Sequence, residues 1–71
     1  GLMIINVDST LVLEEPKLMP FKKRMRENIS QALGIPEASV NIKATTQEGV
    51  GAIGRGEAIA AYAVASVERA K

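Results

Sequence analysis

The feature that most constrains this chain is that it is short and lacks the side chains that usually stabilise a short fold. It has 71 residues, with no cysteine and no histidine. A domain of this size buries only about 60% of the surface that its unfolded chain exposes, and disulfides, a structural metal or a partner chain usually compensate. The sequence therefore favours a partner chain. With one Tyr, one Phe and no Trp, the core is expected to consist of Ile, Val, Leu, Met and Ala.

Charge and hydropathy exclude several classes of partner. The net charge of +1 gives no overall positive field, so we expect neither a nucleic acid nor an acidic membrane surface as partner. No apolar run approaches the roughly 20 residues of a membrane span, and no signal-peptide pattern is present. A cytoplasmic or plastid-stromal protein is the expectation. Because the chain opens at Gly1 and enters an apolar stretch at once, we expect residues 1–71 to be one fragmentary domain.

Alternation of apolar residues predicts a strand from Met3 to Leu13. Every second position is apolar apart from Ser9, which is the period of a strand with one buried face. Pro16 and Pro20 follow, and each disfavours regular structure just before it, so the strand is expected to end in a stiff loop. The opposite face of the strand carries Asn6, Asp8 and Thr10.

A helix is predicted from Pro20 to Leu33. Proline suits the first helical turn and Gly34 suits the C-terminal cap, and apolar residues recur between them at Phe21, Met25, Ile29 and Leu33. The other face is mostly basic. Such a face can bind a phosphate or can simply be exposed to solvent, and the sequence favours a solvent-exposed face. The residues of that face are Lys22, Lys23, Arg24, Arg26 and Glu27.

Two further elements complete the predicted fold. Alternation predicts a second strand over Val40–Thr45, and an alanine-rich segment from Glu57 to Ala70 predicts a second helix. The apolar stripe of this helix would be Ile59, Ala63, Val64 and Val67. The predicted class is α+β in the order strand-helix-strand-helix, sandwich-like and part of a larger sheet with helices on one face.

The loop over residues 45–56 could carry chemistry. It holds two threonines, Glu48, four glycines and Arg55 between a strand end and a predicted helix start. Glycines let backbone N–H groups approach an anion, arginine matches phosphate oxygens, and a carboxylate can hold Mg²⁺ between phosphates. These residue types suit a diphosphate. A mobile loop, with glycines that only serve turns and Arg55 in a surface ion pair, explains the same composition.

The sequence also bears on a dinucleotide site and on catalysis by this segment alone. Gly49, Gly51 and Gly54 form a literal G-x-G-x-x-G pattern, but a dinucleotide site also needs a carboxylate at the end of a second strand. The acid that follows, Glu68, falls on the predicted second helix. With no cysteine or histidine to act as nucleophile, imidazole base or zinc ligand, catalysis by this segment alone would be incomplete.

Four pieces of the sequence together resemble one enzyme family. They are Asn6-Val7-Asp8-Ser9-Thr10, then Pro16-Lys17-Leu18-Met19-Pro20, then Val40 to Glu48 containing K-A-T-T-Q-E, then Gly54-Arg55-Gly56-Glu57-Ala58-Ile59-Ala60. In this order and spacing they resemble the C-terminal half of the 2-C-methyl-D-erythritol 2,4-cyclodiphosphate synthase family. The resemblance implies a lyase of non-mevalonate isoprenoid biosynthesis that releases CMP.

The resemblance also implies roles for particular residues. The cytidine pocket would be lined, partly through backbone groups, by Leu13, Glu14, Glu15, Pro16, Lys17, Leu18 and Met19. Of these, Lys17 would lie near the phosphates. The phosphates would be held by Thr45, Thr46 and Glu48, and Gln47 would also contact the substrate. Thr46 would stabilise the transition state and Glu48 would bind a bridging Mg²⁺ or Mn²⁺. Arg55 would point to the phosphates or to the central cavity of a homotrimer. Ala52 would also face the substrate.

Departures from the family pattern leave an alternative open. The family's zinc ligands lie in its N-terminal half, so this chain would bind no catalytic zinc. Ala52 stands where relatives often carry an aromatic residue, and Tyr62 where some carry a glutamate facing the cavity. By the resemblance, the enzyme binds a cytidine diphosphate substrate at subunit junctions, and this chain would supply the cytidine- and phosphate-binding half. The alternative is a non-catalytic assembly module.

Overall fold

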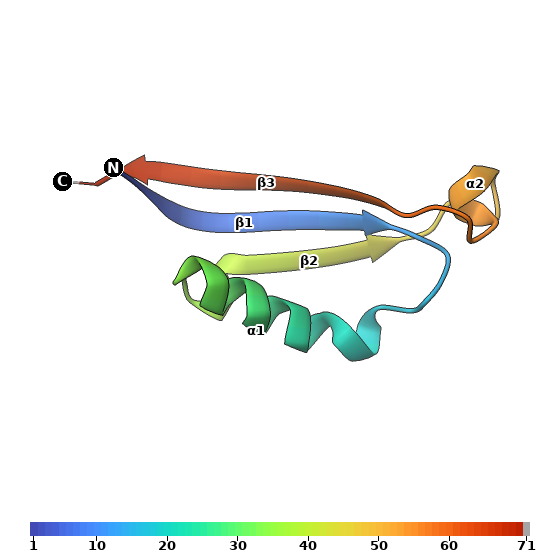
Figure 1. The fold of residues 1–71 in the computed structure, drawn as a ribbon, viewed down its shortest axis with the longest axis horizontal. Coiled ribbons are helices and arrows are strands. Elements are labelled where there is room, and N and C mark those ends of the chain that lie inside the picture. The colour runs from blue at the N-terminus through green and yellow to red at the C-terminus, as the bar shows by residue number, and fades with distance from the viewer. Residues whose placement is uncertain (71) are drawn as a thin grey trace.

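A three-stranded mixed sheet with one long helix beside it makes up the computed structural model, which describes residues 1–70 (Figure 1). The strands lie in the order β2-β1-β3, with β2 parallel and β3 antiparallel to the central strand β1. Along the chain the elements are β1 (Leu2–Val12), a 3-10 turn η1 (Met19–Phe21), α1 (Lys22–Leu33), a 3-10 turn η2 (Glu37–Ser39), β2 (Val40–Thr45), α2 (Gly51–Gly54) and β3 (Ala60–Arg69).

The two strands predicted from alternation are confirmed. Strand β1 pairs with β2 from Val7 opposite Val40 to Val12 opposite Thr45. Against β3 its register shifts between Ile4 and Asn6, a β-bulge of the kind that bends a strand. Beyond the bulge the predicted polar face of β1 is present. Its side chains line a hollow together with those of the neighbouring strand β3; the residues are Asn6, Asp8, Thr10, Tyr62, Val64 and Ser66.

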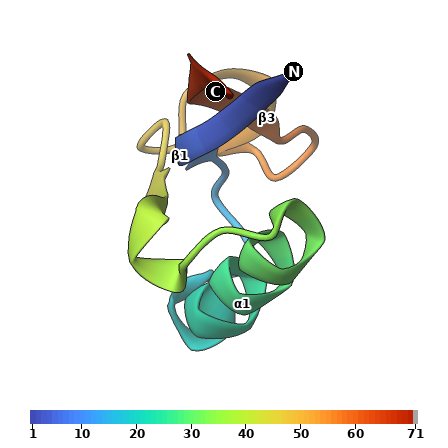
Figure 2. The same ribbon diagram turned by 90° about the vertical axis from the view of Figure 1, so that its left-hand side faces the viewer.

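The first predicted helix is confirmed as η1 followed by α1. Gly34 ends it in the left-handed conformation, with φ 67°, and its N–H donates to the carbonyl of Ser30. Met25 and Ile29 are half-buried, and α1 lies against β2 on one side of the sheet (Figure 2). The outward positions Lys23, Arg24 and Arg26 are exposed, as expected of a solvated face.

The second predicted helix is wrong. Residues Ala60–Arg69 form strand β3, which pairs along the full length of β1, so the order is strand-helix-strand-strand with the short α2 before the last strand. Alanine favours helix and is depleted in strands, but pairing with β1 satisfies a whole row of backbone donors and acceptors. Tertiary pairing therefore overrides local propensity. The α+β class is confirmed.

The core is small and lies where β1, β2 and α1 meet. Its buried side chains are Val12, Leu13, Val40 and Ile42. By contrast, every residue of β3 from Ala61 to Arg69 is exposed, including Val64 at 70%. None of the helices within residues 1–70 is both long and apolar enough to cross a membrane.

Candidate functional site

The candidate site lies where the parallel strands β1 and β2 end. The carboxyl ends of parallel strands meet at one edge of a sheet, a common place for ligand pockets. The ladder extends one step past β1, because the N–H of Leu13 donates to the carbonyl of Thr45 over 3.0 Å. The loop after β1 and the loop after β2 therefore leave the sheet side by side.

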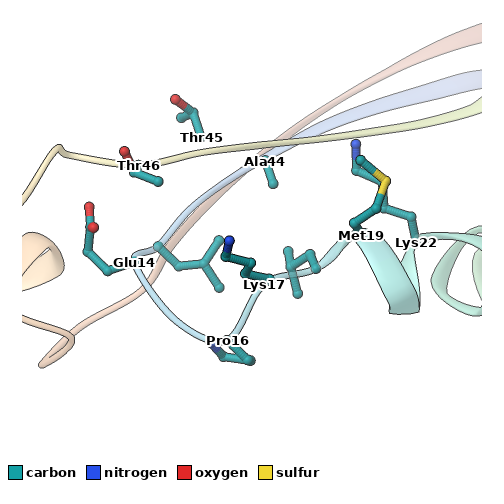
Figure 3. A pocket seen from close by; sticks show the side chains of 10 residues that line it. Glu14, Pro16, Lys17, Met19, Lys22, Ala44, Thr45 and Thr46 are labelled. Carbon is teal, nitrogen blue, oxygen red and sulfur yellow. The ribbon is translucent and has the colours of Figure 1, made fainter.

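A cavity of about 270 Å³ opens between these two loops and the start of α1. Pro16, Leu18 and Met19 contribute apolar surface, while two lysines and two threonines contribute polar groups. Figure 3 shows Glu14 at one end, Lys22 and Met19 at the other, and Lys17 between them. Thr45 at the end of β2 and Thr46 just after it face them. The lining residues are Leu13, Glu14, Pro16, Lys17, Leu18, Met19, Lys22, Ala44, Thr45 and Thr46.

The cavity brings together most, but not all, of the residues that sequence reasoning selected. The stretch from Leu13 to Met19 lines it except for Glu15, and Thr45 and Thr46 line it as well. Gln47, Glu48, Ala52 and Arg55 lie outside the lining. Gln47 and Glu48 lie in the turn after β2, whereas Ala52 lies in α2 and Arg55 follows its last residue.

Sequence reasoning missed Lys22 and Ala44 as lining residues. Lys22 was assigned to the solvated basic face, but it is the first residue of α1 and is half-buried against the pocket. Ala44 follows the buried Val40 and Ile42 at a spacing of two, so strand periodicity could have placed it on the pocket side.

The loop after β2 is a tight turn held by hydrogen bonds. Glu48 and Gly49 both have positive φ, 53° and 79°, and the N–H of Val50 donates to the carbonyl of Gln47 over 3.0 Å. This is the pattern of a type I′ turn. The N–H of Glu48 also donates to Thr46 Oγ1 over 3.2 Å. The turn therefore has a defined hydrogen-bonded conformation.

A carboxylate from the neighbouring loop fastens this turn. Glu14 Oε1 accepts from the N–H of Gln47 over 2.8 Å and, at 3.5 Å, from the N–H of Gly49. Glu14 is half-buried. One carboxylate thus links the loop after β1 to the loop after β2.

Arg55 lies in an ion pair with Glu57. Its Nε donates to Glu57 Oε2 over 3.0 Å and its Nη2 donates to Oε1 over 3.2 Å. Both side chains are more than half exposed, and Arg55 lines a separate hollow with Glu14 and Glu15. The arrangement agrees with the surface ion-pair interpretation of this arginine.

The glycine pattern of the loop does not form a dinucleotide site. Gly49 lies in the turn, whereas Gly51 and Gly54 bound the four-residue α2. The strand that follows, β3, is antiparallel to β1, so this segment is not the βαβ unit that a dinucleotide site needs. A Cβ added at Gly54 would collide with the backbone of Gly49, which gives this glycine a packing reason.

The described chain offers no preformed metal centre. Within residues 1–70 there is no group of three or more His, Cys, Asp or Glu side chains that could hold a metal ion. Glu48 is exposed, and no second carboxylate joins it in such a group.

Taken together, an α+β chain with a polar-edged pocket at the ends of two parallel strands has the architecture of a segment that binds a small charged molecule. The chain belongs to the YgbB family, whose model matches residues 1–68. A curated relative, 2-C-methyl-D-erythritol 2,4-cyclodiphosphate synthase of Alkaliphilus metalliredigens, is 55% identical over 62 residues, which cover 87% of this chain and 39% of the relative. The family expected from the sequence motifs is confirmed.

Solved structures agree with this assignment. A 2C-methyl-D-erythritol 2,4-cyclodiphosphate synthase from Plasmodium vivax matches 99% of this chain and 47% of its own, with TM-score 0.96 and 38% identity. A CDP complex of IspF from Plasmodium falciparum matches 93% of this chain and 42% of its own, with TM-score 0.86 and 33% identity. The chain thus spans less than half the length of each of these relatives.

Proposed function

We propose that this chain is the cytidine- and phosphate-binding C-terminal half of a 2-C-methyl-D-erythritol 2,4-cyclodiphosphate synthase. The observation that carries the proposal is the cavity at the ends of β1 and β2, in which lysines and threonine hydroxyls adjoin apolar side chains. The CDP complex of a family member supports the same ligand class. The pathway would be non-mevalonate isoprenoid biosynthesis, in a bacterial cytoplasm or a plastid stroma.

The cavity suits a cytidine diphosphate group. A nucleoside diphosphate has a flat base at one end and oxyanions at the other. Leu18 and Met19 would pack against the cytidine, Lys17 would pair with a phosphate, and the threonine hydroxyls would donate to phosphate oxygens. The roughly 270 Å³ of the cavity is slightly below the range of about 300–1,000 Å³ typical of small-molecule sites, so the rest of the substrate would be held elsewhere.

The other contacts would come from the remaining part of the enzyme and from neighbouring copies. A homotrimer with sites at subunit junctions is implied by the family resemblance, and the exposed β3 leaves surface available for such contacts. The same exposure supports a second candidate, a non-catalytic assembly module. Release of CMP by this chain with no N-terminal half added would rule out that candidate.

The proposed reaction closes a ring on 4-diphosphocytidyl-2-C-methyl-D-erythritol 2-phosphate. An oxygen of the 2-phosphate forms a bond to the β-phosphorus, the bond from that phosphorus to the oxygen shared with the α-phosphate breaks, and CMP leaves with the electron pair. The residues of this chain would orient the diphosphate and stabilise charge on its oxygens. Thr46 is the residue proposed to donate to those oxygens during the transfer.

The residues present do not fit catalytic zinc, since the chain has no histidine and no cysteine. A Mg²⁺ or Mn²⁺ ion fits better, because such ions are commonly held by one or two carboxylates together with substrate phosphates. Glu48 would be that carboxylate. When bound, the ion would neutralise charge on the phosphate oxygens.

A matched pair of lysine variants tests the proposal. Lys17 lines the cavity, whereas Lys23 lies on the outer face of α1, 4.0 Å from Glu27, with its side chain 82% exposed. Lys17→Ala should weaken CDP binding in Mg²⁺ roughly tenfold, because a charged hydrogen bond to phosphate is lost, while Lys23→Ala should leave it unchanged. Equal affinities for both variants in a calorimetric titration would contradict the proposed site.

A further inference from the structure

The turn after β2 presents two backbone N–H groups to one point in space. The positive φ values of Glu48 and Gly49 turn the backbone so that the N–H groups of Gln47 and Gly49 converge. Convergent backbone N–H groups usually form a receptor for an anion. In this chain the anion is a side chain of the protein itself, the carboxylate of Glu14.

Glu14 can reach this position because of the strand register. The hydrogen bond from Leu13 to Thr45 places the end of the β1 ladder beside the end of β2. Leu13 is 5% exposed and fixes the backbone on one side of Glu14, so the carboxylate meets the turn directly.

We propose that Glu14 is a positioning residue that holds the Thr46–Gly49 turn in its binding conformation, rather than a residue that contacts the nucleotide. A carboxylate directed at a diphosphate would repel it. Two backbone N–H groups instead donate to Glu14 Oε1 at the edge of the cavity, and those donors are not available to phosphate.

The consequence for Thr46 follows from hydrogen-bond accounting. Thr46 Oγ1 accepts from the N–H of Glu48, so a lone pair of the hydroxyl is used within the turn. A hydroxyl has one proton to donate in addition to its acceptor lone pairs, and that proton remains for a ligand oxygen. By fixing the turn, Glu14 would fix the direction in which Thr46 donates. This role rests on the proposed function, which assigns the ligand oxygen to a phosphate.

The experiment compares Glu14→Ala, Glu14→Gln and the control Glu37→Ala in the 71-residue chain. Glutamine keeps an acceptor oxygen at the same reach, alanine removes it, and Glu37→Ala removes an exposed carboxylate at η2, near the other end of β2. Without nucleotide, Glu14→Ala should shift the amide protons of Gln47 and Gly49 upfield. It should also speed hydrogen exchange at Gln47 by roughly three- to tenfold, since a hydrogen bond to a charged acceptor is lost.

A CDP titration of the same variants supplies the second readout. Glu14→Ala should weaken CDP binding several-fold, and Glu14→Gln should restore most of the affinity together with the turn amide signals. Unchanged turn amides in Glu14→Ala would overturn the inference. Equal loss of CDP affinity in Glu14→Ala and Glu14→Gln, with the turn amides intact in the glutamine variant, would also overturn it, because that pattern indicates direct contact.

The two proposals fail separately. If the wild-type chain does not bind CDP but its turn amides respond to Glu14→Ala as described, the positioning role stands and the nucleotide-binding function fails. If CDP binds and the turn amides ignore Glu14, the nucleotide site stands and the positioning role fails.

Discussion

At the scale of single residues, the site depends on a few backbone positions as much as on charged side chains. Glu48 adopts φ 53° without being glycine, an uncommon conformation for a residue with a Cβ. It is stabilised by hydrogen bonds on either side of it, from Glu48 to Thr46 and from Gly49 to Glu14. The conformation of the loop that could hold phosphates therefore depends on hydrogen bonds to Thr46 and Glu14.

Gly54→Ala should disrupt this loop. The added Cβ would collide with the backbone of Gly49, and such overpacking costs about 1–3 kcal/mol. We expect altered amide shifts from Gln47 to Gly56 and weaker CDP binding. Gly1→Ala is the control, because a Cβ at Gly1 meets nothing within 4 Å. Native-like shifts in Gly54→Ala would show that the turn is not packed against α2 as described.

Thr46→Ala tests the proposed catalytic donor in a longer synthase that contains this segment. Loss of one hydrogen bond to charge that develops in the transition state typically lowers kcat by on the order of 100-fold. We expect turnover to fall more than KM rises, and Thr46→Ser to recover most of the rate. An unchanged kcat in steady-state measurements of CMP release would remove Thr46 from this role.

At the scale of elements, the sequence correctly predicted the helices and strands whose local pattern agrees with their tertiary packing. Alternation in β1 and β2 and the glycine cap of α1 were sufficient to place these elements. The first part of the alternating face of β1 is nevertheless uncovered, with Met3 52% and Ile5 41% exposed. Segment 60–69 was predicted wrongly because its alanines favour a helix, and its pairing partner lies 48 to 67 residues away, from Val12 opposite Ala60 to Leu2 opposite Arg69. Long-range pairing is invisible to local pattern.

In the candidate site, too, some residues could be predicted from the local sequence and others depend on tertiary structure. Lys17, Thr45 and Thr46 could be selected from residue type and family motif. The hydrogen bonds from the turn to Glu14 could not be predicted, since they depend on the register between β1 and β2 and on a turn with positive φ values. Lys22 was missed because its charge suggested solvent, whereas the start of α1 brings it to the cavity.

Ala63→Val distinguishes a strand from a helix by the sign of its effect. Ala63 lies opposite Ser9 in the antiparallel pair and is exposed. Valine favours strands, by up to about 1 kcal/mol, and disfavours helices by roughly 0.5 kcal/mol relative to alanine. We expect a higher urea midpoint for the variant. A lower midpoint would indicate that residues 60–69 are helical in solution.

At the scale of the whole molecule, the chain is more extended than a compact domain. Its extents are 48 × 21 × 14 Å and its radius of gyration is 14.3 Å, whereas a compact domain of this length would have a radius of about 11 Å. The small buried core and the exposed β3 have the same origin, since the sheet has only one helix against it. This shape fits a part of a larger assembly.

Association should therefore stabilise the chain measurably. Anything that binds only the folded state raises the melting temperature with concentration, so the Tm of the chain should rise as protein concentration increases, and light scattering should show a species larger than a monomer. A monomer with a Tm that does not depend on concentration would contradict the need for a partner surface.

In the proposed function, the ends of β1 and β2 form a half-site for cytidine diphosphate. The most direct test titrates the chain with CDP, ADP and NAD in Mg²⁺ while its amide chemical shifts are recorded. We predict a preference for CDP, with shifts concentrated at residues 13–19 and 45–48. A folded chain that responds equally to all three nucleotides, or to none, would contradict the claim.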